Sequence, residues 1–393
     1  MADPATPSPA APAAAASPAA EPATPAPASP PAAPAAETTT ETPAAETTTA
    51  TPAAAAAAAP APANTGILEA DDVVEAEDDD SALGTPGDAS ETTSMASFIY
   101  RYREQHGRTY HAYKADGEYK SYWLPNDDRE NERLDLQHTL FMLTQDNQLF
   151  TCPAVKDKPL RRVLDAGCGT GIWSIDFADD HPETSVVGVD LSPIQPTFVP
   201  PNVEFFVDDL EADWNFVNDF DFIYARFMTG SIKDWPRFFS QAFSHMYPGG
   251  HIEVCDILSP LHCDDGSLPD DCDAQKWNVL LLETSLKIGV GIDSARRYEQ
   301  QMTEAGFENV VKVEYKWPMN SWPKDKKHKE MGIWSNMNMT AALQALTLML
   351  FTKVLGWSVA EVEVLLAGVR KDFKNKEYHA YWPIWVVYGQ KPE

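Results

Sequence analysis

The sequence predicts an α/β domain built on a parallel β-sheet. Three observations support this fold class. From residue 160 onward, short apolar runs alternate with amphipathic stretches. Three glycines at alternate positions, in DAGCGTG (165–171), join the first run to the stretch that follows it. A tight Pro-Gly-Gly turn at 248–250 leads into a later run. Strands that alternate with helices in this way form parallel sheets with right-handed crossovers.

Each expected strand contains an apolar run, the last of them rich in β-branched residues. The expected helices are amphipathic stretches between them. The strands are expected at 160–165, 185–190, 202–207, 220–226, 249–258, 309–317 and 384–390. The helices are expected at 171–181, 234–246, 273–288, 294–305, 340–355 and 359–373. Ahead of the first strand, the turn at 125–127 opens a charged helix whose apolar face includes Leu134, Leu140, Phe141 and Leu143.

Composition divides the chain near residue 97. Residues 1–63 consist mostly of Ala, Pro, Thr and Ser, and an acidic patch follows. Such a segment cannot bury enough apolar surface to offset its ordering entropy, so we expect it to be disordered and to contribute nothing to the fold. The expected organisation is a tail (1–96), an N-terminal aromatic and helical cap (97–158), a core (159–317), a helical insertion (318–380) and a final strand of the core (381–393).

The charge argues against nucleic acid as a direct partner. The chain has 30 Lys and Arg against 59 Asp and Glu, a formal charge of −29. Fifteen of these acids precede residue 98, so the rest of the chain still carries −14. Phosphate binding depends on clustered Lys and Arg. No signal-peptide pattern opens the chain and no run approaches the ~20 apolar residues that span a bilayer. We therefore expect a cytoplasmic protein with no membrane partner.

The five cysteines do not indicate a metal site. Cys255, Cys263 and Cys272, with His262, come nearest to a zinc-binding set. Cys255 falls in a predicted strand, however, and the other spacings fit no common zinc pattern. We expect no bound metal.

The glycine-rich segment carries the main functional signal. Asp165 ends the first strand, and Gly167, Gly169 and Gly171 follow it. Glycine is needed where the backbone takes positive φ or where a ligand approaches closely. The spacing G-x-G-x-G differs from the G-x-G-x-x-G fingerprint that binds a dinucleotide pyrophosphate. An NAD-linked oxidoreductase would need that absent spacing.

Further acids end the next two strands. Asp190 follows one apolar run, and Asp208 and Asp209 follow the next. S-adenosyl-L-methionine has no phosphate, but it presents an α-amino group, a ribose diol and an adenine amino edge. Acids at three successive strand ends suit these three groups. The pattern therefore favours S-adenosyl-L-methionine over NAD as the cofactor.

Several segments resemble the LaeA-like family of filamentous fungi, within the class I S-adenosylmethionine-dependent methyltransferases. They are GRTYHAY (107–113), LPNDDRENERLDLQH (124–138), GTGIWSIDFADDHP (169–182), DLSPIQPTFVPPNVEF (190–205), GSIKDWPRFF (230–239), WPKDKKHKE (322–330) and FTKVLGWSVAEVEVLLAGVRKDF (351–373). The resemblance covers about residues 98–391. One departure is Cys168, which stands where the family is expected to have threonine.

The resemblance implies a Rossmann-like sheet of seven strands, mostly parallel with a reversed last strand, and helical lid insertions. It also implies cofactor-binding roles. Asp165 and the three glycines would face the methionine part, Asp190 would bind the ribose hydroxyls, and Leu191 would lie beside the adenine. Asp208, Asp209 or Leu210 would lie at the adenine amino group. Arg226, at the end of the fourth strand, is a candidate for contacting a carboxylate of the substrate or the cofactor.

The substrate pocket is expected above the carboxyl ends of the strands, where open α/β sheets bind ligands. The N-terminal aromatic segment and the 318–380 insertion can cover this edge and exclude water from a reactive methyl donor. We therefore expect Tyr110, His111 and Trp334 near the pocket mouth. Methyl transfer requires no catalytic triad. The candidate bases are His111, His138, His251 and Tyr224, and none is assigned.

Two functions follow from the resemblance. The first is an enzyme that methylates a small molecule of secondary metabolism. The alternative is a nuclear regulator of secondary-metabolite gene clusters that works through partner proteins. The first hundred residues contain no Lys or Arg and hence no basic localisation segment. This composition favours the enzyme.

Overall fold

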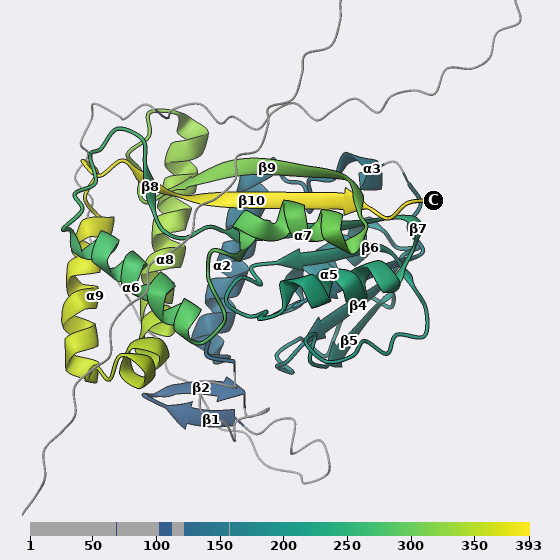
Figure 1. Cartoon of the computed structure of the whole chain (residues 1–393), viewed down its shortest axis with the longest axis horizontal. Coiled ribbons are helices and arrows are strands. Elements are labelled where there is room, and N and C mark those ends of the chain that lie inside the picture. The colour runs from purple at the N-terminus through teal and green to yellow at the C-terminus, as the bar shows by residue number, and fades with distance from the viewer. Residues whose placement is uncertain (1–67, 69–101, 112–121, 157) are drawn as a thin grey trace, which may run out of the picture. The chain divides into compact units, whose positions relative to one another are not determined.

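The computed structural model describes residues 68, 102–111, 122–156 and 158–393 (Figure 1). Apart from residue 68, the tail expected at 1–96 lies outside the described residues, as do parts of the expected N-terminal cap. No helix in the described part of the chain is long and apolar enough to cross a membrane.

The described residues form a central sheet with the strand order β5-β4-β3-β6-β7-β10, and β9 pairs with the far side of β10. The parallel strands are β3 (Arg162–Ala166), β4 (Ser185–Asp190), β5 (Val203–Val207), β6 (Phe220–Arg226) and β7 (Met246–Ile257). Strand β10 (Ala380–Gln390) runs antiparallel between β7 and β9 (Glu308–Pro318). The expected seven strands with a reversed last strand are therefore confirmed. A two-residue strand that the sequence did not predict, β8 (His262–Cys263), also pairs with β10.

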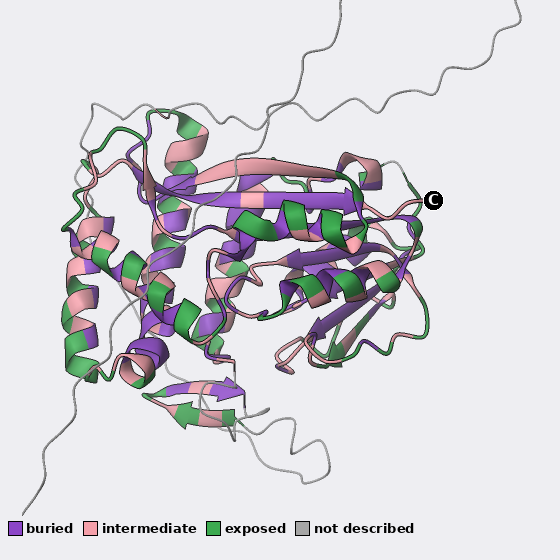
Figure 2. Ribbon diagram, in the orientation of Figure 1, coloured by how far each residue is buried: buried purple, intermediate pink, exposed green. Residues whose placement is uncertain are grey.

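Helices cover both faces of the sheet. Val163 and Leu164 are adjacent in β3, yet they belong to different apolar clusters, because successive strand residues point to opposite faces. The Leu164 cluster is covered by α5 (Trp235–Ser244), the short 3₁₀ helix η1 (Ser294–Arg297) and α7 (Tyr298–Ala305). The Val163 cluster is covered by α3 (Pro153–Lys156) and α4 (Ile172–Asp180). Strand β10 is buried along almost its whole length (Figure 2).

A third cluster joins the helices beside the sheet. It is built from α2 (Asp128–Thr144), α6 (Asp273–Lys287), α8 (Lys326–Val354) and α9 (Val359–Phe373), which pack on one another and on β9 and β10 (Figure 1). Helix α8 begins 14 residues earlier than expected. Asp325 caps it by accepting a hydrogen bond from the His328 backbone N–H, and the helix then continues unbroken to Val354.

A short hairpin precedes these elements and was also not predicted. Its strands are β1 (Tyr102–Gln105) and β2 (Arg108–His111). The turn between them is formed by His106 and Gly107, which both have positive φ, at 55° and 71°. Two such residues in succession form the tight turn that suits the twist of a hairpin.

Two carboxyl groups are buried in β7, away from the pocket described below. Glu253 accepts hydrogen bonds from the backbone N–H groups of Thr151 and Cys152, at 2.9 and 2.6 Å. Asp256 accepts from the Tyr298 hydroxyl at 2.6 Å. Burial raises the pKa of each of these carboxyl groups to about 7, although the hydrogen bonds oppose the shift.

These shifts predict that stability falls as pH rises through neutrality. The Glu253 carboxyl has a higher pKa in the folded chain than in the unfolded chain, where it titrates near ~4.3. Its contribution to stability is therefore complete below that value and is lost as pH rises through about 7. We expect Glu253→Gln to flatten the fall in Tm between pH 5 and pH 8, with Asp256 accounting for what remains. Thermal unfolding across this range tests the prediction, and Glu283→Gln, an exposed position on α6, is the control. Parallel pH profiles for the wild type and Glu253→Gln would contradict it.

Candidate functional site

Two adjoining pockets lie at the carboxyl edge of the parallel strands. The donor pocket, as we name it, follows the ends of β4 and β5 and includes Leu191, Asp208, Asp209 and Leu210. The second, the chamber, extends from the glycine loop after β3 to helices α2, α6 and α8. The two share five wall residues, namely Tyr122, Trp123, Gly167, Asp190 and Met228. A ligand bound across this shared wall would lie in both pockets.

The glycine loop has left-handed backbone at all three glycines, with φ of 84° at Gly167, 54° at Gly169 and 81° at Gly171. Gly167 and Gly169 line the chamber, as expected for a ligand-facing loop. Gly171 lies outside both pocket walls and begins α4, where a Cβ would overlap the ring of Phe205. The third glycine thus makes room for Phe205, and a ligand-facing role for it stays a prediction.

Asp190 joins the glycine loop to the pocket walls. Its Oδ2 accepts a hydrogen bond from the Gly169 N–H and its Oδ1 accepts one from the Ser192 N–H, each at 2.9 Å. Burial raises the pKa of the Asp190 carboxyl, and these backbone donors limit the rise. Each carboxylate oxygen retains a lone pair after these bonds. Asp190 can therefore hold the loop and also accept a hydrogen bond from a ligand.

The neighbouring acids differ in their surroundings. Asp165 is buried in the wall of the chamber, where its Oδ2 accepts a 2.7 Å hydrogen bond from the Ser174 hydroxyl. Burial raises the pKa of the Asp165 carboxyl to about 6. Asp208 is exposed, and Asp209 accepts a hydrogen bond from the Glu211 N–H at 2.9 Å. The donor pocket therefore combines acids with the apolar side chains of Leu191 and Leu210.

Arg226 ends β6 in the wall of the chamber and is held by two neighbours. Its Nη2 lies 3.1 Å from Nδ1 of His138, and its guanidinium lies over the ring of Phe141. His138 Nε2 lies 2.9 Å from Asp176 Oδ2. Because the guanidinium can only donate, Nδ1 accepts and Nε2–H donates to Asp176. Burial and the charge of Arg226 lower the pKa of His138 to about 3. His138 is therefore a neutral support for Arg226.

The other candidate bases occupy different positions. His111 lines the donor pocket, and burial lowers its pKa to about 4. Neither of its ring nitrogens has a hydrogen-bond partner among the described residues. His251 and Tyr224 lie outside both pocket walls, and the Tyr224 ring stacks on Trp173 at 4.1 Å. Of the four candidates, only His111 faces a pocket.

The three residues expected near the pocket mouth lie in different surroundings. His111 is in a pocket wall, but Tyr110 is fully buried outside both walls, and Trp334 packs against the cluster of α6, α8 and α9. Residues 318–380 nevertheless cover the chamber with a later part of α8, through Met339, Ala342, Ala345 and Leu346. Trp334 lies five or more residues before these positions and therefore packs at a different level along the helix.

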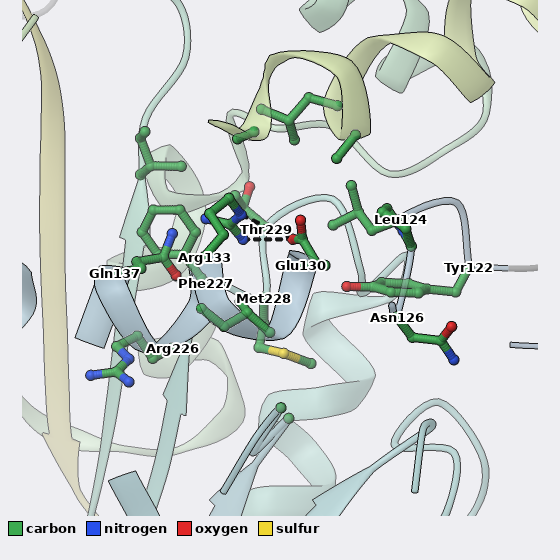
Figure 3. Close-up of a pocket in the computed structure, with 18 of the residues that line it drawn as sticks. Tyr122, Leu124, Asn126, Glu130, Arg133, Gln137, Arg226, Phe227, Met228 and Thr229 are labelled. Carbon is green, nitrogen blue, oxygen red and sulfur yellow. Dashed lines mark hydrogen bonds and ion pairs between the residues drawn. The ribbon is translucent and has the colours of Figure 1, made fainter. Parts of the chain in front are cut away.

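Sequence reasoning missed the polar wall that α2 contributes. Glu130, Arg133 and Gln137 line the chamber and follow each other at spacings of three and four residues, which places them on one face of the helix (Figure 3). This spacing was visible in LPNDDRENERLDLQH. Phe227, in the same wall, has φ of 56°, an uncommon conformation for a bulky residue that is typical of functional sites.

The comparisons with known proteins agree with this geometry. A family model described as a methyltransferase domain matches residues 136–312. Methyltransferase pytC of Aspergillus terreus is 42% identical over 304 residues, which cover 77% of this chain and 92% of that protein. Secondary metabolism regulator LAE1 of Cochliobolus heterostrophus is 35% identical over 74% of this chain and 94% of that protein.

Solved structures are more distant. Haemonchus contortus phosphoethanolamine N-methyltransferase 2, in complex with S-adenosyl-L-methionine, is 16% identical with a TM-score of 0.38 and covers 67% of this chain and 53% of that chain. The sequence relatives are closer, and this chain matches more than nine tenths of the length of pytC and of LAE1. The chain belongs to the LaeA-like family of class I S-adenosylmethionine-dependent methyltransferases of filamentous fungi.

Proposed function

We propose that this protein transfers a methyl group from S-adenosyl-L-methionine to a small molecule of fungal secondary metabolism. The observation that carries the proposal is the joining of the two pockets. The acidic strand ends that suit the cofactor open directly into a chamber walled by α2, α6 and α8. A small molecule in that chamber would lie beside the cofactor and away from bulk water.

The wall residues fit this cofactor. Asp190 offers a fixed carboxylate for the ribose hydroxyls, and Leu191 and Leu210 offer apolar surface for the adenine, with Asp208 and Asp209 beside its amino group. At the other end, Asp165 would face the α-amino group and Arg226 the carboxylate. When bound, the cofactor supplies an electrophilic methyl group on its sulfonium.

The chain's own contribution is to orient the acceptor and exclude water. These two effects can supply much of the catalysis of an in-line displacement. Among the acids of the chamber wall, Glu130 is paired with Arg133, and Asp165 and Asp190 are assigned to the cofactor. We therefore assign no catalytic base and attribute catalysis to positioning.

The alternative function is regulation through partner proteins. It is favoured by the relatives named as secondary metabolism regulators, LAE1 and laeA, just as the first proposal is favoured by pytC and the probable methyltransferase tdiE. The first proposal places the protein in the cytoplasm and the second in the nucleus. The helical cover of the chamber favours a small acceptor over a protein surface.

A labelling experiment separates these functions. The purified protein is incubated with methyl-labelled S-adenosylmethionine and an extract of cells that lack the gene. We expect label in an organic-soluble compound that is found methylated only in cells with the gene. Label confined to protein would support the regulatory alternative. Asp190→Ala serves as the control, because its weaker binding of the cofactor should reduce the label in either fraction.

A further inference from the structure

The chamber has a largely apolar part whose residues do not line the donor pocket. Its aromatic walls come from Phe227, Trp277 and Trp382, on three elements that are far apart in the sequence. Helix α8 presents Ala342 and Ala345, whose short side chains leave space between these walls. Aromatic faces around such a space suit a flat apolar compound.

The charged groups in this part of the wall neutralise one another. Arg133 donates to Glu130 Oε1 through Nε and Nη2, at 3.1 and 2.7 Å (Figure 3). Its Nη1 donates to Asn338 Oδ1 at 2.7 Å, and Arg108 Nη2 lies 3.9 Å from Glu130 Oε2. A charged acceptor would have to break this buried pair or remain uncompensated, and both are costly. The wall therefore favours a neutral acceptor.

Gln137 differs from Glu130 and Arg133 because one of its polar atoms has no hydrogen-bond partner among the described residues. It is one helical turn beyond Arg133 and faces the chamber beside Phe227 (Figure 3). Its side chain is only 3% exposed, yet its Nε2 has no hydrogen-bond partner among the described residues. A buried donor without a partner is unfavourable unless a ligand supplies the acceptor. Among the other polar groups of the chamber wall, Asn278 Oδ1 accepts from the Ser259 hydroxyl.

We propose that Gln137 is a specificity-determining residue and that the acceptor substrate is a neutral, flat, largely apolar compound whose carbonyl or hydroxyl oxygen accepts a hydrogen bond from Gln137 Nε2. This inference rests on the proposed function, because it takes the chamber to be the acceptor site. It assigns the recognition of the acceptor to α2 and leaves cofactor binding to the strand ends. Gln137 thus selects the acceptor and its orientation.

Three naphthalenes of similar shape test the proposal: 2-acetylnaphthalene, 2-isopropylnaphthalene and 2-naphthoate. Their dissociation constants are measured by equilibrium dialysis with S-adenosylhomocysteine present. We expect the wild type to bind the ketone about 3- to 10-fold more tightly than the hydrocarbon, the range for one neutral hydrogen bond. The carboxylate should bind at least about tenfold more weakly than the ketone, because Arg133 is already paired with Glu130 and Arg226 is assigned to the carboxylate of the bound cofactor product.

Gln137→Met keeps the length of the side chain and removes its hydrogen bonding. We expect this variant to bind ketone and hydrocarbon equally, whereas Gln300→Met, at an exposed position on α7, should retain the wild-type preference. Gln137→Leu gives a second test if the methionine variant does not fold. A preference that survives both substitutions, tightest binding of the carboxylate, or no binding of any probe would overturn the proposal. Binding of S-adenosylmethionine, measured separately, tests the proposed function and should be unchanged in Gln137→Met.

Discussion

Replacing Asp190 by alanine should weaken S-adenosylmethionine binding by about 1–3 kcal/mol, or roughly 5- to 150-fold in dissociation constant. The substitution removes the charged acceptor proposed for the ribose hydroxyls. It also leaves the backbone N–H groups of Gly169 and Ser192 without the carboxylate to which they donate in the wild type. The loop loses its anchor together with the ligand contact, so we expect the effect to lie toward the upper end of this range. Titration calorimetry on the purified protein measures it.

Two control variants separate charge from shape. Asp190→Asn keeps the side-chain size and one oxygen acceptor, so we expect an intermediate loss of affinity. Asp208→Ala removes an exposed acid from the same pocket and should have a smaller effect. Thermal unfolding without ligand checks that each variant is folded. Equal affinity of the wild type and Asp190→Ala, or binding of NADH by the wild type, would reject the cofactor assignment.

The parallel strands could be predicted because their signals are local. Each contains a short apolar run, and Asp165 and Asp190 lie at or next to the ends of β3 and β4, at the same edge of the sheet. The alternation of strands and helices alone predicts that a ligand binds at this edge. The sequence could therefore place Asp165 and Asp190 at the site without any knowledge of side-chain packing.

Helix α8 shows why other elements could not be predicted. Its first half contains Gly332 and two asparagines, Asn336 and Asn338, which have low helix propensity. Tertiary packing overrides this propensity. A Cβ at Gly332 would overlap the backbone carbonyl of Asn320, so the glycine is what allows the helix to lie against that segment. The chamber wall formed by α8 depends on this contact between distant residues, and no periodicity reveals it.

Gly171, the third glycine of the loop, is a second residue whose packing could not be predicted from the sequence. The motif predicts positive φ at Gly171, and the structure has it. The motif does not reveal what the missing side chain would meet. The Phe205 ring lies over Gly171 and also over Gly188, where a Cβ would be 2.5 Å away from it. A ligand-binding pattern thus includes a position whose purpose is packing between β4, β5 and the start of α4.

This packing predicts a large loss of stability in Gly171→Ala. A side chain at this position adds the cost of left-handed backbone, about 1–2 kcal/mol. The methyl group must also displace the Phe205 ring, which has little room to move because it packs against Gly188 as well. Overpacking of this kind adds about 1–3 kcal/mol. Gly356→Ala is the matched control, because Gly356 has φ of 71° and nothing within 4 Å of a Cβ. Urea denaturation of both variants gives the steric contribution as the difference between their free energies of unfolding.

The substitution Phe205→Leu tests whether the Phe205 ring is what a side chain at position 171 meets. If the ring is the obstacle, Gly171→Ala should cost less in the Phe205→Leu background than in the wild type, whereas Gly356→Ala should cost the same in both. Such coupling between residues in contact is what a double-mutant cycle measures. Equal losses of stability in Gly171→Ala and Gly356→Ala would show that the Phe205 ring moves aside at no cost.

Because Gly171 is outside both pocket walls, folded Gly171→Ala protein should bind S-adenosylmethionine within a few-fold of the wild type. A strong loss of affinity without a loss of stability would instead return this glycine to the ligand-facing role that the motif suggested.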